Sequence, residues 1–291
     1  MSDNLARTAV VEDCLNLMLA SEHICEAFKE AGREHANFAQ FGSFASPGDQ
    51  IALQQLAKYR ENWESHKSVK EEIGFRSAPL VPKTKAESVL AYVLGWLCHR
   101  AADSKLKPGS AEAGLYQDAL LFHRLYVNEG QTPQAYRSPG APLEQAATIG
   151  SKELAELFRE LQQRFFIEMH TYVPDVDNIE GWFDKLHVQL KERSAYMDRF
   201  AEALMNPEPE KVQQHVDGTN FYSDEDAIIR LTLSIRQGAQ PSQAEIEAAY
   251  AAEPKSRYAQ ALKQGYRNLL SANAFFTGSI DQGRLSEQLA V

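Results

Sequence analysis

The chain has 291 residues, of which 44% are hydrophobic and 24% charged, so its composition excludes intrinsic disorder and allows a substantial core. Its 30 basic and 40 acidic side chains give a formal net charge of −10. A broad nucleic-acid or anionic-membrane surface needs clustered positive charge, so this balance argues against both. The 16 glycines and 12 prolines are too few for a collagen-like or low-complexity architecture.

Apolar residues recur at helical spacing along almost the whole chain, whereas the alternation of a half-buried strand is nearly absent. The pattern predicts helices over residues 8–31, 49–72, 85–103, 111–127, 151–171, 178–205, 224–237, 242–252 and 255–275. Ser242 and Glu245 form a capping-box pattern, and the run from Ser223 to Asp226 resembles another helix start. We therefore expect an all-α protein, a multi-helix bundle.

A segment rich in proline and glycine, residues 130–150, is the best candidate for a boundary along the chain. We expect two helical halves, 1–130 and 131–291, that pack into one domain. The alternative is that the segment is only a loop within one bundle.

The first residues lack the pattern of a secretory signal, since Glu12 and Asp13 interrupt the apolar run early. The longest apolar run, Val89–Cys98, is far too short for a membrane span. The three cysteines are odd in number, lack metal or redox spacing and are most simply buried thiols. These features predict a cytoplasmic protein with no membrane span.

The helix predicted over 85–103 is the most informative segment, because nearly all of its faces are apolar. At its end His99 and Asp103 are four residues apart and so share one face. A carboxylate there is costly to bury unless it is paired or binds a metal ion, and a His-x-x-x-Asp pair can bind one zinc ion. The alternatives are a His99–Asp103 hydrogen bond, or a solvated helix end where Asp103 pairs with Arg100 or Lys105.

Three further candidates each have an ordinary explanation when taken alone. His23, on the first predicted helix, can be a surface histidine, and Asp49 can cap the helix that follows it. His66 lies near the end of that helix, where it can interact with the helix dipole. The order of these residues along the chain is what gives them weight.

The ordered set resembles the N-terminal half of the zinc-dependent phospholipase C family, over about residues 15–125. The matching parts are His23, the segment from Gly42 to Asp49, His66, and the motif Gly95-Trp-Leu-Cys-His99-Arg-Ala-Ala-Asp103. The related P1/S1-type nucleases share the helical scaffold and the multi-zinc site. The resemblance therefore implies a multi-helix bundle of the phospholipase C and P1 nuclease type.

The resemblance also implies roles for these residues. Asp49, His66, His99 and Asp103 would bind one zinc ion, and Asp103 would bridge to a second zinc ion held by His23. Two such ions polarise a phosphoryl oxygen and lower the pKa of bound water, so a phosphodiester can be hydrolysed at neutral pH. Asp49 would be the catalytic base or the group that orients the water.

The chain departs from the family pattern at several points. Where the family has a further histidine this chain has Lys105-Leu-Lys-Pro-Gly, and the later His-x-x-x-Glu is missing. Asp118 and His123 can complete a modified site, or His123 can be a hydrogen-bonded core histidine. The segment Pro47-Gly48-Asp49 inserts a residue into the usual Pro-Asp. We therefore expect one or two zinc ions rather than three.

The sequence thus predicts a metal-dependent, phospholipase C-like hydrolase that acts on a phosphoester of a small molecule, a nucleotide or a lipid headgroup. The alternative is a non-catalytic helical scaffold or partner-binding protein that keeps the fold, with His99 and Asp103 as a hydrogen-bonded pair. A di-iron oxidase is disfavoured because Glu-x-x-His pairs are scarce.

Overall fold

The computed structural model describes residues 4–43, 52–61, 63, 83–126 and 208–289. These residues form helices and turns and include no strand, which confirms the all-α prediction. The elements with described bounds are α1 (Asn4–Ala20), α2 (Glu26–Glu34), α3 (Ala36–Gly42), α5 (Lys83–Leu106), α6 (Ala111–Leu125), α11 (Pro209–His215), the 3-10 turn η2 (Asp217–Thr219), α12 (Ala227–Arg236), α13 (Gln243–Ala251), α14 (Arg257–Phe276) and α15 (Gln282–Leu289).

Most of the predicted helices that fall on described residues are present. Those over 85–103, 111–127, 224–237, 242–252 and 255–275 correspond to α5, α6, α12, α13 and α14. The capping box of Ser242 and Glu245 is formed in both directions. Of the helix predicted over 49–72, residues 52–61 are helical. The helices predicted over 151–171 and 178–205, and the boundary at 130–150, lie outside the described residues.

The prediction of one continuous helix over 8–31 is wrong, because the chain turns between α1 and α2. Ser21 Oγ accepts a hydrogen bond from the backbone N–H of His23 at 3.2 Å. Asn273 of α14 then accepts from the Cys25 N–H and donates to the His23 carbonyl, both at 2.9 Å. A side chain 250 residues away in sequence thus holds the turn. Ile24 stays buried in it, so the apolar periodicity continues across the break.

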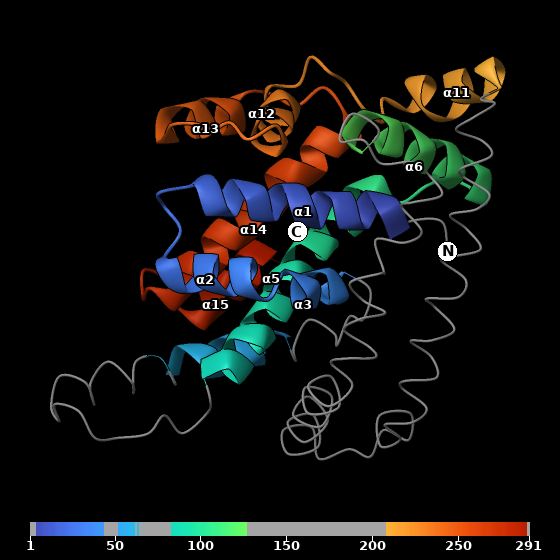
Figure 1. The fold of residues 1–291 in the computed structure, drawn as a ribbon. Coiled ribbons are helices and arrows are strands. Elements are labelled where there is room, and N and C mark those ends of the chain that lie inside the picture. The colour runs from blue at the N-terminus through green and yellow to red at the C-terminus, as the bar shows by residue number, and fades with distance from the viewer. Residues whose placement is uncertain (1–3, 44–51, 62, 64–82, 127–207, 290–291) are drawn as a thin grey trace, which may run out of the picture.

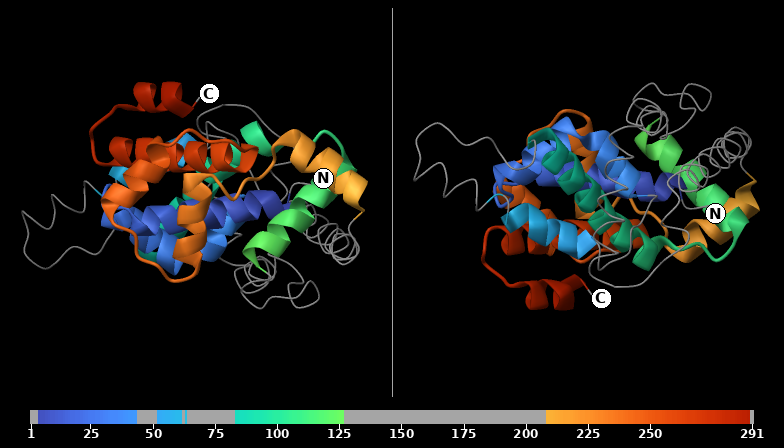
Figure 2. Two further views of the ribbon diagram at one scale, coloured as in Figure 1. Left: turned by 90° about the horizontal axis from the view of Figure 1, so that it is seen from above. Right: turned by 90° about the horizontal axis from the view of Figure 1, so that it is seen from below.

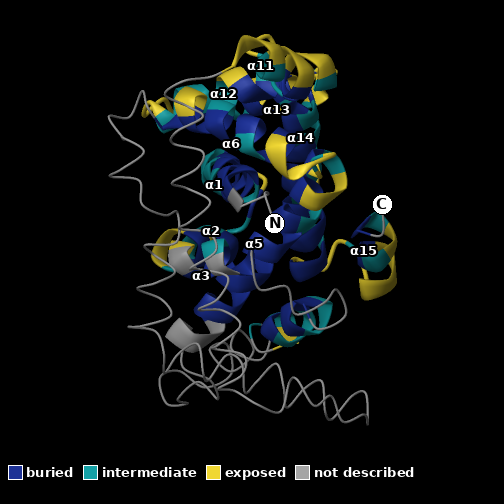
Figure 3. Ribbon diagram, turned by 90° about the vertical axis from the view of Figure 1, so that its right-hand side faces the viewer, coloured by how far each residue is buried: buried dark blue, intermediate teal, exposed yellow. Residues whose placement is uncertain are grey.

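Helix α5 is the centre of the described bundle. It packs against α14 and α3 most extensively and also against α1 and α2. Figure 1 shows α1 crossing α5 and α14, and Figure 3 shows α1 and α5 buried along most of their length while α11 and α15 are largely exposed. In both views of Figure 2, α15 lies at the periphery. Within the described residues, no helix is long and apolar enough to cross a lipid bilayer.

Two glycines allow α3 and α5 to cross in backbone contact. A Cβ placed on Gly95 would lie 1.8 Å from the Ala39 carbonyl oxygen. A Cβ on Gly42 would lie 2.2 Å from the Tyr92 carbonyl oxygen and 2.9 Å from the Trp96 nitrogen. Real Cβ atoms do not approach other atoms so closely, so this crossing requires glycine at both positions. Gly42 and Gly95 each belong to one of the two motifs in the phospholipase C resemblance.

A buried ionic network joins α1 to α12. The side chain of Arg236 is 8% exposed and donates to Asp13 Oδ1 at 2.5 Å and to Glu12 Oε2 at 3.0 Å. Tyr258 donates to Asp13 Oδ2 at 2.8 Å, and Tyr126 donates to Glu12 Oε2 at 2.6 Å. The two carboxylates therefore keep hydrogen-bond donors in a part of the core where an unpaired charge would be costly.

Candidate functional site at the end of helix α5

The His99–Asp103 pair lies at the C-terminal end of α5. His99 is 8% exposed, and its Nε2 is 3.1 Å from Asp103 Oδ2. The side chain of Asp103 is 43% exposed, so this carboxylate lies at the edge of the core. The spacing predicted that the two side chains share one face of the helix, and they do. Either of two arrangements considered from the sequence, a chelating pair or a hydrogen-bonded pair, is compatible with this separation.

The other oxygen of Asp103 binds a cation from the chain itself. Arg7 of α1 approaches Oδ1 with Nη2 at 2.6 Å and Nε at 2.8 Å. The carboxylate therefore lies between an imidazole and a guanidinium. Sequence reasoning from the motif did not include Arg7, and it considered Arg100 or Lys105 as alternative basic partners. No local pattern identifies Arg7, because the contact depends on the way α1 crosses α5.

Asp118 binds the same end of α1. It is 1% exposed, and its Oδ1 accepts the backbone N–H of Ala6 at 3.1 Å. A carboxylate is favourable there, because the first N–H groups of a helix have no partners within the helix and carry partial positive charge. Asp118 and Asp103 thus contact adjacent residues of the first turn of α1. His123, from the same helix as Asp118, is exposed, so it is not the core histidine considered as an alternative.

His23 lies near the opposite end of α1. Its Nε2 is 2.7 Å from Glu247 Oε1, and its side chain is 57% exposed. The hydrogen bond from His23 is the main cause that lowers the pKa of the Glu247 carboxyl, and a hydrogen bond from Gln243 also lowers it. At a rise of 1.5 Å per residue, Arg7 and Ala20 are about 20 Å apart along α1. Within this structure His23 is therefore not brought next to Asp103, as a shared pair of zinc ions would require.

Asp49 and His66 lie outside the described residues. Asp49 is seven residues after Gly42, which lies against Tyr92 and Trp96 of α5. Among the described residues, no group of three or more His, Cys, Asp or Glu side chains is arranged to hold a metal ion.

The C-terminal part of the chain also supports this end of α5. Arg257, the first residue of α14, donates to the carbonyl oxygens of Lys105 and Lys107 at 2.8 and 2.9 Å. A cation is favourable at the carbonyl end of a helix, and this one satisfies acceptors that α5 leaves open. Further along α14, Asn268 donates to the Leu97 carbonyl at 2.9 Å. The predicted motif is therefore held by elements from both ends of the sequence.

Comparisons with known proteins add no relative, since no protein family, curated protein or solved structure matches the chain.

Proposed function

We propose that the chain is a metal-dependent phosphoester hydrolase of the phospholipase C type, with His99 and Asp103 as ligands of a zinc ion. The observation that carries the proposal is the geometry of the His99–Asp103 pair, whose Nε2 and Oδ2 atoms are 3.1 Å apart at the end of α5. The crossing of α3 and α5 supports it, because Gly42 and Gly95 belong to the two motifs that the resemblance joins.

The donor atoms fit a zinc ion. In a tetrahedral site with zinc–ligand distances near 2.0–2.1 Å, two ligand atoms are about 3.3 Å apart. His99 Nε2 and Asp103 Oδ2 are separated by 3.1 Å. The guanidinium of Arg7 binds the other oxygen, Oδ1, so Oδ2, which faces His99, is the oxygen that would bind the metal ion. Imidazole nitrogen and carboxylate oxygen are both ligands that zinc prefers.

In this proposal the chain's own residues position and hold the reacting groups. A bound zinc ion would supply Lewis acidity toward a phosphoryl oxygen. Asp49 would orient or deprotonate the water, and Arg7, beside the pair, would contribute positive charge toward a phosphate. The substrate is a phosphoester of a small molecule or a lipid headgroup.

A specific observation favours a second candidate, a non-catalytic helical scaffold. Three of the predicted ligands among the described residues already bind another part of the chain. Arg7 binds Asp103, Ala6 binds Asp118 and Glu247 binds His23. In that case His99 and Asp103 hold α1 against α5 and bind no metal ion.

Metal content separates the two candidates. The hydrolase proposal predicts about one zinc ion per purified chain by mass spectrometry, and its loss in Asp103→Ala. The matched control is Asp224→Ala, because Asp224 is also half-exposed and pairs with an arginine, Arg124 at 3.2 Å. The wild type and Asp224→Ala should also hydrolyse bis(p-nitrophenyl) phosphate, whereas Asp103→Ala should not. Wild-type protein that stays free of metal after dialysis against zinc would support the scaffold.

A further inference from the structure

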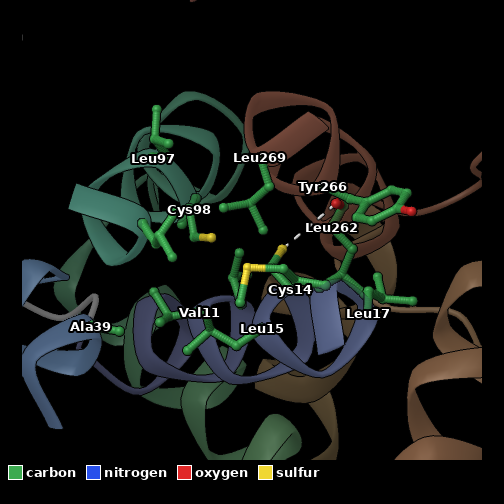
Figure 4. Packing of buried hydrophobic residues seen from close by; sticks show 14 of the residues in the cluster. Val11, Cys14, Leu15, Leu17, Ala39, Leu97, Cys98, Leu262, Tyr266 and Leu269 are labelled. Atoms are coloured by element: carbon green, nitrogen blue, oxygen red, sulfur yellow. Dashed lines mark hydrogen bonds between the residues drawn. The ribbon is translucent and has the colours of Figure 1, made fainter. Parts of the chain in front are cut away.

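Two thiols from different helices meet in the core. Cys14 of α1 and Cys98 of α5 are both 0% exposed and are free cysteines. Their side chains point toward the same space in the core (Figure 4), and the Cys14 thiol donates to the Leu262 carbonyl, with an Sγ–O distance of 3.7 Å. Figure 4 shows both sulfur atoms in the space between α1, α5 and α14.

Helix α14 confines the Cys14 sulfur on its other side. A Cβ on Gly265 would lie 2.5 Å from Cys14 Sγ, so α14 leaves no room for the sulfur to move toward it. The sulfur is therefore held in the space that it shares with Cys98. A disulfide requires the two sulfurs to approach to about 2.05 Å, and this shared space is where they would do so.

We propose that Cys14 and Cys98 form a dithiol that converts to an intramolecular disulfide linking α1 to α5. The two S–H bonds break, one S–S bond forms, and two protons leave. The two electrons reduce a low-molecular-weight disulfide, such as glutathione disulfide, to two thiols. This inference does not rest on the proposed hydrolase function, because it uses neither side chain of the His99–Asp103 pair, although Cys98 directly precedes His99 in the chain.

The burial of the pair determines how the exchange proceeds. Burial is the main cause that raises the pKa of the Cys14 thiol well above its ordinary value, and the neighbouring Cys98 thiol raises it further. The thiolate is the attacking species, so exchange is slow in the closed protein and passes through local opening. Once one sulfur forms a mixed disulfide, the neighbouring thiol displaces the glutathione. The proposal therefore predicts the intramolecular product at equilibrium and no stable glutathione adduct.

The test uses the full-length chain with Cys25→Ser, which leaves only the two core thiols. Cys25 is the N-cap residue of α2 and its side chain makes no capping hydrogen bond, so serine is a suitable replacement. The protein is equilibrated in glutathione buffers under two conditions, without urea, where it is folded, and with urea, where it is unfolded. Free thiols are then alkylated and the intact mass is measured. The ratio of disulfide to dithiol gives the effective concentration of one thiol toward the other.

The proposal predicts an effective concentration at least about tenfold higher in the folded chain than in urea, because the fold holds the sulfurs together. In the Cys25→Ser/Cys98→Ser variant, the product should change to a glutathione adduct of Cys14 or to unreacted thiol. An effective concentration in the folded protein equal to or below that in urea would overturn the proposal. So would a stable glutathione adduct on the chain that keeps both core thiols.

Discussion

At the residue scale, Arg236 supplies the positive charge that Asp13 and Glu12 face in the core. The side chains of Asp13 and Arg236 are 0% and 8% exposed, so the pair has little water to compensate for the loss of one partner. A buried carboxylate left without its cation typically costs 3–5 kcal/mol. This network connects a residue pair near the start of the chain to α12, more than 200 residues later.

We expect Arg236→Met to lower the free energy of unfolding by about 3 kcal/mol, because it keeps much of the side-chain volume but removes the charge. The measurement is urea denaturation followed by circular dichroism. Arg230→Met is the matched control on the same helix, since Arg230 is exposed and donates to the Glu225 carbonyl. It should change stability by no more than about 0.5 kcal/mol. Equal losses in the two variants would contradict the importance assigned to the network.

At the element scale, the contact between α3 and α5 depends on the absence of a side chain at Gly95. Gly95→Ala would place a methyl group 1.8 Å from the Ala39 carbonyl, and the backbones must separate to accommodate it. We expect a loss of at least about 2 kcal/mol in the free energy of unfolding. Gly109→Ala is the control, because nothing lies within 4 Å of the added Cβ. Similar stability in the two variants would show that α3 does not pack against α5 as described.

The capping box of α13 gives a dependence on pH. Hydrogen bonds from the backbone and the side chain of Ser242 lower the pKa of Glu245 from 4.5. The stabilisation by the charged Glu245 carboxylate is therefore present above pH 4.5. It is lost as the pH falls through the lowered pKa of the folded state. The difference in melting temperature between the wild type and Glu245→Gln should be largest above pH 4.5 and shrink at lower pH. A difference that stays constant across this range would contradict the role of the charged form.

How far the elements could be predicted depended on their length and on their capping residues. The long helix α5 and the capped helix α13 were predictable, because periodicity and Ser242 with Glu245 act locally. The short helices α3, α11 and α15 were not predicted, since seven or eight residues give too little periodicity. The turn after α1 was missed because Asn273 holds it from the far end of the sequence.

The site was predictable only as far as one helix could reveal it. The i, i+4 spacing of His99 and Asp103 gave their contact, since both lie on α5. Arg7 could not be found in this way, because its contact depends on how two helices cross. The buried position of Asp13 had a visible signal, a carboxylate on an otherwise apolar face, but its partner Arg236 is on a distant helix.

At the scale of the whole molecule, the candidate site is a junction of distant segments. The first turn of α1 binds Asp103 and Asp118, while Arg257 of α14 binds the last carbonyls of α5. Residues near both ends of the sequence thus determine the position of His99 and Asp103. We propose that a divalent cation binds at this junction.

Anomalous diffraction at the zinc absorption edge, from crystals of the full-length chain grown with zinc, shows whether a zinc ion binds at this junction. The hydrolase proposal predicts an anomalous peak within bonding distance of His99 Nε2 and Asp103 Oδ2, with Asp49 as a further ligand. A map without a peak at this position, with Arg7 still bound to Asp103, would contradict it.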